Sequence, residues 1–315
     1  MHKYEEISIL VAGGSGAMGH KLIKQLLIQY PNAMIHCLDV QAPLINSNRL
    51  TFHDVDIRSQ TIHEILKVNN CKIVFHLIAI MDGVSASEEE IFDIEVNGLQ
   101  NIINASIDTE VEHFIFISSG AVYGYKPGLP RFIPESQSVE TNNIIRYGRN
   151  KAIAENLLQS FCIEKGLDMT IFRPCSILGA DSSNIVSKWF DRKVIIGLKN
   201  TLVPFSFVWE DDLIACFLEA MQKRITGVYN VTGKGWVSLE QIAQLQSKKY
   251  LPFHKERLQK VIGLLNRMSL IRYKKEHLDF LKYRPVLDRK KLTSAFSYKF
   301  KWTSLEAFER YLLTH

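Results

Sequence analysis

Short apolar runs alternate along the first half of the chain with longer segments that mix apolar and polar positions. Six runs have the length of buried strands: Ile7 to Ala12, Met34 to Leu38, Leu50 to His53, Ile73 to Ile78, Phe114 to Ile117 and Met169 to Phe172. The segments 17–30, 59–69, 87–107 and 147–164 have helical length. Because parallel strands need crossover connections, this alternation predicts an α/β fold, a doubly wound parallel sheet with helices on both faces. Ligands are then expected at the carboxyl ends of the strands.

The rhythm changes after Arg173-Pro174, where short strands mix with further helices. These helices are predicted at 211–222, 238–248, 255–268 and 303–313. We expect residues 1–174 to form the first domain, with 205–231 returning to it. Residues 175–204 and 232–315 would form a smaller mixed α/β lobe that binds the substrate.

Composition narrows the class of protein but not its chemistry. The chain has 315 residues, is 46% hydrophobic and 23% charged, and carries a formal charge of +5, as is typical of an ordinary globular protein. Its positive charge is concentrated in 248–291, where 14 Lys or Arg face 4 Asp or Glu. The segment is either a solvated helix face or an attractor for an anionic substrate such as a nucleoside diphosphate. Nucleic-acid binding is not expected, because no nucleic-acid motif accompanies the charge.

Several classes of site are disfavoured. The first residues lack the apolar core of a secretory signal, and the longest apolar runs are too short to span a bilayer. We therefore expect a cytoplasmic protein without a membrane span. Five cysteines without a C-x-x-C pair indicate neither a disulfide framework nor a zinc site, and the histidines lack metal-ligand spacing.

A glycine-rich turn follows the first predicted strand. Gly13, Gly16 and Gly19 would permit a tight turn whose free amides, at the start of the next helix, hold a pyrophosphate. Asp39 ends the second strand 20 residues after Gly19, where an acid accepts hydrogen bonds from the adenosine ribose. A carboxylate there repels a 2′-phosphate, so the Rossmann-type domain is predicted to bind NAD rather than NADP.

Tyr147 and Lys151 stand four residues apart, which places both on one helix face. We expect the Lys151 ammonium to lower the pKa of the Tyr147 phenol so that it exchanges protons near neutral pH. Ser119, at the end of the fifth strand, would hydrogen bond the same substrate oxygen. The three residues predict hydride transfer between a carbinol carbon and a nicotinamide.

Together these motifs resemble the extended branch of the short-chain dehydrogenase/reductase superfamily, the NAD-dependent epimerase/dehydratase family. Further matches are Asp54-Val55-Asp56-Ile57 and His76-Leu77-Ile78-Ala79, together with Val96-Asn97-Gly98, which resembles a family helix, N-V-x-G-T, whose Asn helps to organise the active site. The resemblance implies Ser119, Tyr147 and Lys151 as catalytic residues. It implies cofactor contacts at Gly13, Gly16, Ala17, Met18, Gly19, Asp39, Asp56, Ile57, Leu77, Ile78, Ala79, Asn97, Tyr147, Lys151 and Pro174. Ser119 and Ser176 are the expected substrate contacts, and NAD is the only cofactor implied.

Three functions follow, in order of preference. The first is an epimerase or related oxidoreductase acting through a transient ketone on a nucleoside-diphosphate sugar. The 4,6-dehydratases of the family are disfavoured, because Gly120 and Ala121 stand where those enzymes carry acids. The second is an alcohol dehydrogenase or ketone reductase of the hydroxysteroid or dihydroflavonol type, and the third is a non-catalytic NAD-binding module. Family relatives frequently dimerise through the helices here predicted at 87–107 and 147–164, so a homodimer is expected.

Overall fold

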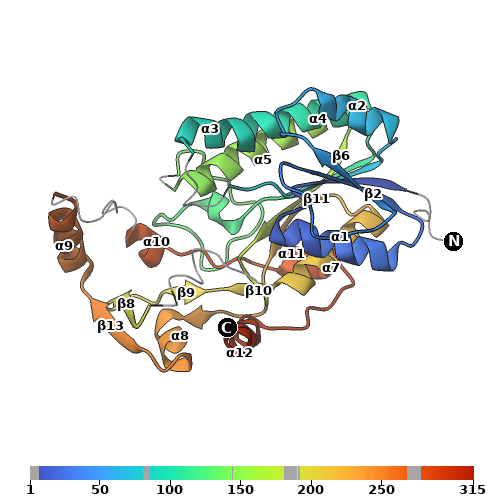
Figure 1. The fold of residues 1–315 in the computed structure, drawn as a ribbon. Coiled ribbons are helices and arrows are strands. Elements are labelled where there is room, and N and C mark those ends of the chain that lie inside the picture. Colours follow the sequence, from blue (N-terminus) through green and yellow to red (C-terminus); the bar gives the residue numbers. More distant parts are fainter. Residues whose placement is uncertain (1–6, 81–85, 144, 181–189, 191, 268–277) are drawn as a thin grey trace.

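The core of the molecule is a seven-stranded parallel sheet (Figure 1). The computed structural model describes residues 7–80, 86–143, 145–180, 190, 192–267 and 278–315. In spatial order the strands are β11 (Gly227–Val231), β6 (Asp168–Pro174), β5 (His113–Ile117), β4 (Ile73–His76), β1 (Ser8–Ala12), β2 (Met34–Asp39) and β3 (Leu50–Asp54). The order reverses beside β1, which brings the carboxyl ends of β1 and β4 together at the point where such sheets bind ligands.

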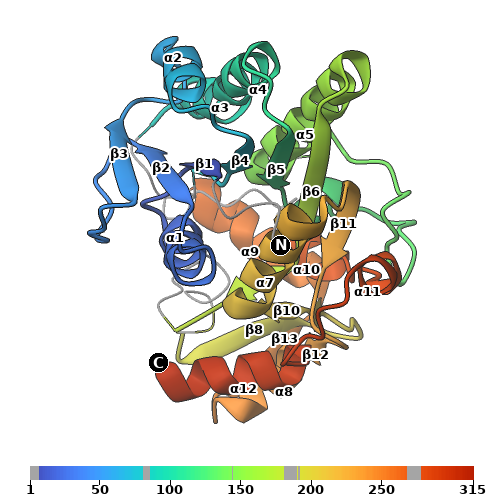
Figure 2. The ribbon, with the colours of Figure 1, turned by 90° about the vertical axis from the view of Figure 1, so that its right-hand side faces the viewer.

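Helices cover both faces of this sheet because each contributes an apolar stripe to a separate core (Figure 2). On one face lie α1 (Ala17–Gln29), α7 (Glu210–Lys223) and α11 (Lys290–Ala295). On the other lie α2 (Thr61–Val68), α4 (Gly98–Asp108) and α5 (Arg146–Lys165). The predicted doubly wound fold is confirmed.

A second group of elements has an aromatic core of its own. Its strands pair as β7 (Ser176–Leu178) with β10 (Phe207–Trp209), β9 (Pro204–Phe205) with β12 (Val237–Ser238), and β8 (Val194–Leu198) with β13 (Lys249–Phe253). Its helices are α8 (Leu239–Leu245), α9 (Lys255–Arg267), α10 (Asp279–Lys282) and α12 (Ser304–Thr314). Phe205, Phe207 and Phe308 are fully buried in that core. The proposed limits of the two domains stay a prediction.

Most predicted elements agree with the structure to within one to three residues. The main exception is the helix expected over 87–107, which is α3 (Glu88–Phe92), a π-helical turn η1 (Asp93–Asn97) and then α4. The helix expected over 238–248 ends at Leu245 because β13 follows. Residue 268, the predicted end of α9, lies outside the described residues.

Candidate active site

The glycine-rich turn connects β1 to α1 and is shaped by two of its glycines. Gly13 has φ +81°, a conformation that favours glycine. A Cβ on Gly19 would lie 2.1 Å from the Gly13 carbonyl oxygen, so the turn closes only with glycine there. Gly16 is the N-cap of α1 and no side chain caps it, which leaves the first amides of the helix, at Ala17 and Met18, free to bind an anion.

Asp39 ends β2 beside this turn, where the sequence predicts it. Its carboxylate accepts hydrogen bonds from the backbone amides of Ser15 at 3.0 Å and Gln41 at 3.3 Å. The acid is thereby tied to the glycine-rich turn, and the predicted contact with a ribose stays a prediction.

The three predicted catalytic residues come together at the carboxyl end of the sheet. Ser119 follows β5 and caps η2 (Gly120–Tyr123), accepting from the Ala121 amide at 3.1 Å. Its hydroxyl is also close enough to the Tyr147 phenol to lower the pKa of that phenol. Lys151, one helical turn further along α5, donates to the carbonyl oxygens of Ile78 at 3.1 Å and Ile117 at 3.0 Å. These carbonyls follow β4 and end β5, so the lysine joins α5 to both strands.

The expected direction of the Tyr147 pKa is wrong in this structure. Burial, together with the charge of Glu95, raises the pKa of Tyr147 to about 12, against the opposing effect of the nearby Ser119 hydroxyl. Burial also lowers the pKa of Lys151 to about 8, against the charges of Glu95 and Glu155. Desolvation disfavours both charged forms, and it is the largest cause of both pKa shifts.

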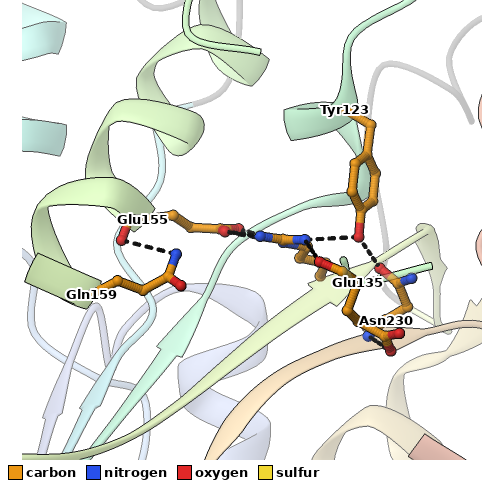
Figure 3. A network of polar contacts seen from close by, with 6 residues as sticks. Tyr123, Glu135, Glu155, Gln159 and Asn230 are labelled. Atoms are coloured by element: carbon orange, nitrogen blue, oxygen red, sulfur yellow. Dashed lines mark hydrogen bonds and ion pairs between the residues drawn. The ribbon is translucent and has the colours of Figure 1, made fainter. Parts of the chain in front are cut away.

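A buried polar network holds α5 in place behind these residues (Figure 3). The Arg173 guanidinium on β6 pairs with the Glu155 carboxylate, its Nε donating at 3.0 Å. Arg173 also donates to the Tyr123 hydroxyl at 2.8 Å, and this hydroxyl donates to Asn230 Oδ1 at 2.8 Å. The network connects α5, η2 and two strands, and thereby fixes Ser119 relative to Tyr147.

The match with known proteins rests on this same part of the chain. The model of the NAD dependent epimerase/dehydratase family matches residues 9–232, more than half of the chain. The chain belongs to this family. Membership in this epimerase/dehydratase family confirms the predicted enzyme class, the resemblance and NAD as the cofactor.

Individual relatives of this family are distant. The protein y4nG of Sinorhizobium fredii is 28% identical over 247 residues, 76% of this chain and 59% of that protein. The UDP-glucose 4-epimerase of Rhizobium meliloti is 28% identical over 188 residues, 58% of this chain and 56% of that enzyme. The chain thus spans less than two thirds of the length of either relative.

A solved structure supports the fold. The UDP-glucose 4-epimerase of Thermotoga maritima with UDP-glucose has a TM-score of 0.72, with 98% of this chain and 99% of that chain covered at 19% identity.

The remaining residues predicted to contact the cofactor or the substrate lie on several elements around the glycine turn and the end of β6. Leu77 and Ile78 pack against the glycine turn, where a Cβ on Gly13 would be 3.0 Å from the Ile78 nitrogen, and Ala79 follows them. Ile57 is buried against Gly98 of α4. Asp56 is bound by Arg58, whose hydrogen bonds lower the pKa of the acid. Pro174 ends β6, and Ser176 opens β7, its hydroxyl accepting from Arg284 at 2.9 Å.

Asn97 does not join the catalytic residues. Its side chain is exposed and donates to Asp93 Oδ1 at 2.8 Å. When Val96 and Gly98 are set on the V and G of the family's N-V-x-G-T motif, the organising position is Glu95. Glu95 is buried beside Arg146. Glu95 stands two residues before Asn97, and placing the motif by its V and G would have found this acid.

Neither metal ligation nor a membrane span is indicated in the described part of the chain. No three His, Cys, Asp or Glu side chains there are grouped so as to hold a metal ion. No helix among the described residues is long and apolar enough to cross a bilayer.

Proposed function

We propose that this chain is an NAD-dependent epimerase or related oxidoreductase whose substrate is a nucleoside-diphosphate sugar. The environment of Arg284 is the observation on which the substrate class rests. Its guanidinium lies 3.9 Å from the ring centre of Phe205 and 4.6 Å from that of Phe280, and Nη2 donates to the Ser176 hydroxyl. Nη1 is buried without a hydrogen-bond partner among the described residues.

Arg284 is half-buried, a cation without a counter-ion is costly to bury, and desolvation lowers the pKa of Arg284 to about 10. Among the described residues no carboxylate is paired with it. The residue also borders a cavity of about 300 Å³ whose charged lining residues are Lys126, Arg131, Lys282 and Arg284, with no acid among the lining. A phosphate group would supply the missing charge, which a neutral steroid or flavonol does not. This favours the nucleotide sugar over the hydroxysteroid or dihydroflavonol alternative.

The position of Arg284 relative to the catalytic residues supports the assignment. Ser176, which it contacts, lies two residues after the sheet strand β6 ends. Three residues beyond Arg284, the side chain of Leu287 packs against Gly120, the neighbour of Ser119. A Cβ on Gly120 would lie 3.0 Å from Leu287, so the acid of a 4,6-dehydratase would also need Leu287 to move.

In the proposed reaction Tyr147 exchanges a proton with a sugar hydroxyl, while Ser119 hydrogen bonds and orients that same substrate oxygen. Lys151, held by two carbonyls, fixes α5 against β4 and β5. The uncapped start of α1 and the glycine turn fit the diphosphate of NAD. The nicotinamide of the bound cofactor would supply the hydride chemistry.

Turnover of UDP-, dTDP- and GDP-sugars, followed by chromatography of the products, tests the proposal. Tyr147→Phe should lower kcat by about 10²- to 10⁴-fold and leave NAD binding intact. Arg284→Gln should raise KM about tenfold or more through the lost phosphate contact, whereas Lys260→Gln, on the exposed face of α9, should not. Ketone reduction with NADH and no conversion of any sugar nucleotide would instead support the dehydrogenase alternative.

We also propose that the chain is cytoplasmic and dimerises through α4 and α5. Ile163 on α5 is 81% exposed, and Leu157 and Phe161 on the same helix are half-buried. Light scattering of the wild type and of Ile163→Lys tests the dimer, which the lysine should weaken.

A further inference from the structure

Glu95 is a buried acid for which the predicted chemistry has no use. Its side chain is 1% exposed, and it lies on the π-helical turn η1 between α3 and α4. A π turn inserts one residue into the helix and so changes which side chain points inward. Here it turns Glu95 toward α5, while Asp93 on the same turn stays partly exposed and pairs with Arg58.

The carboxylate of Glu95 is bound by three groups from two elements. It accepts from the Ile80 amide at 2.9 Å and from Asn150 Nδ2 at 2.9 Å, and Arg146 Nη1 lies 3.5 Å away. Arg146 in turn donates to the Ile80 carbonyl at 3.3 Å. The amide of Ile80 is thus bound by Glu95, and its carbonyl is bound by Arg146.

The residues that contact Glu95 are close in sequence to Tyr147 and Lys151 on α5 and to the carbonyl that Lys151 binds after β4. Ile80 is two residues beyond Ile78, whose carbonyl accepts from Lys151. Asn150 is the neighbour of Lys151 in α5, and Arg146 is the neighbour of Tyr147. The carboxylate therefore connects the segment that follows β4 to the helix that carries both catalytic side chains.

We propose that Glu95 is a positioning residue for the catalytic pair: it fixes the end of β4 against α5 and supplies the negative charge that Lys151 and Tyr147 face. Two amide donors and a guanidinium contact its carboxylate, and these contacts offset the desolvation cost of a buried negative charge. The inference deepens the proposed function and rests on it for its kinetic readout alone.

The charge of Glu95 acts on both members of the pair. It raises the pKa of Lys151, opposing the burial that brings this pKa to about 8, and it raises the pKa of Tyr147 as well. The other titratable or charged groups around the pair are His76 on β4, Tyr125 after η2, and Arg146 and Glu155 on α5. Removing the Glu95 charge should therefore move the ionisation of both catalytic residues toward lower pH.

A measurement that needs no substrate tests this directly. The ¹³Cε resonance of Lys151, assigned by its loss in Lys151→Met, is titrated in the full-length protein. In the wild type its midpoint should lie at about 8. Glu95→Gln should make the acid constant about tenfold larger, as expected for loss of one nearby charge. The matched control Asp93→Asn, on the same turn but outside the buried site, should leave the midpoint unchanged.

The kinetic readout uses the sugar nucleotide that the wild type turns over. Both limbs of the pH profile of kcat should move toward acid in Glu95→Gln, a change that a merely structural defect does not produce. If circular dichroism shows that this variant is unfolded, Glu95→Asn, which carries the residue of the family motif, replaces it. An unshifted Lys151 midpoint in a folded variant overturns the inference. A shifted midpoint without turnover of any sugar nucleotide sustains the inference and refutes the proposed function.

Discussion

At the scale of single residues, backbone geometry separates glycines that the sequence presents as equivalent. A Cβ on Gly19 would meet the Gly13 carbonyl oxygen at 2.1 Å, whereas one on Gly16 would meet that same oxygen at 3.4 Å, an ordinary contact. Gly16 also has φ −68°, which any residue adopts. The fold itself therefore requires glycine at 19 but not at 16.

Gly19→Ala is accordingly expected to destabilise the protein by about 1–3 kcal/mol, the usual cost of overpacking, because the turn must open. Gly16→Ala should stay within about 0.5 kcal/mol of the wild type. Thermal unfolding of both variants without NAD measures the difference. Equal losses of stability would mean that the turn is not held as closely as the structure has it.

The catalytic residues show what spacing reveals and what it hides. Spacing and order along the chain place Ser119, Tyr147 and Lys151 together, since local periodicity and strand ends determine those positions. They give the wrong direction for the pKa of Tyr147, because desolvation depends on everything packed around the phenol. Arg284 reaches Ser176 from 108 residues away, and no local pattern predicts such a contact.

At the scale of elements, α5 offers a controlled comparison, because besides the Glu95–Arg146 pair it carries one fully buried ion pair and one exposed ion pair. Glu155 and Arg173 are fully or almost fully buried, whereas Glu88 is 71% exposed and Arg149 33%. Glu155→Gln leaves the Arg173 charge uncompensated and should cost about 3–5 kcal/mol. Arg149→Gln should cost no more than about 1 kcal/mol.

Urea unfolding of the two variants separates these cases. A loss below about 1 kcal/mol in Glu155→Gln would show that water or Tyr123 compensates Arg173, and that the network does not anchor the helix.

Periodicity predicts the long helices and the sheet strands well, because each buries a continuous apolar stripe. It fails at η1, where one inserted residue interrupts an otherwise regular pattern and turns Glu95 inward. Periodicity also misses β13, a largely exposed strand that contains Pro252. This strand forms by pairing with β8, which lies more than 50 residues earlier in the chain. Irregular turns and exposed strands are set by partners distant in sequence.

At the scale of the whole molecule, the central sheet contains histidines that are buried in their neutral form. His36 on β2, His76 on β4 and His113 on β5 are each at most 4% exposed. Burial lowers the pKa of His36 and His113 to about 4 and that of His76 to about 3. In the unfolded chain each would titrate near its ordinary value of 6.5. Between these values the unfolded state binds more protons, so stability falls as the pH falls from about 6.5 toward 4.

His76 offers the sharpest test, because its ring packs against Phe114 and Phe116 and, within the described part of the chain, neither of its nitrogens has a hydrogen-bond partner. His76→Phe keeps an aromatic ring there and removes one group that must be charged on unfolding. Between pH 7 and pH 5 the free energy of unfolding should fall by about 2 kcal/mol less in this variant than in the wild type. His254→Asn, at an exposed position, should lose stability as the wild type does. Urea unfolding at both pH values gives the comparison, and parallel losses in His76→Phe and the wild type would place the acid sensitivity outside this strand.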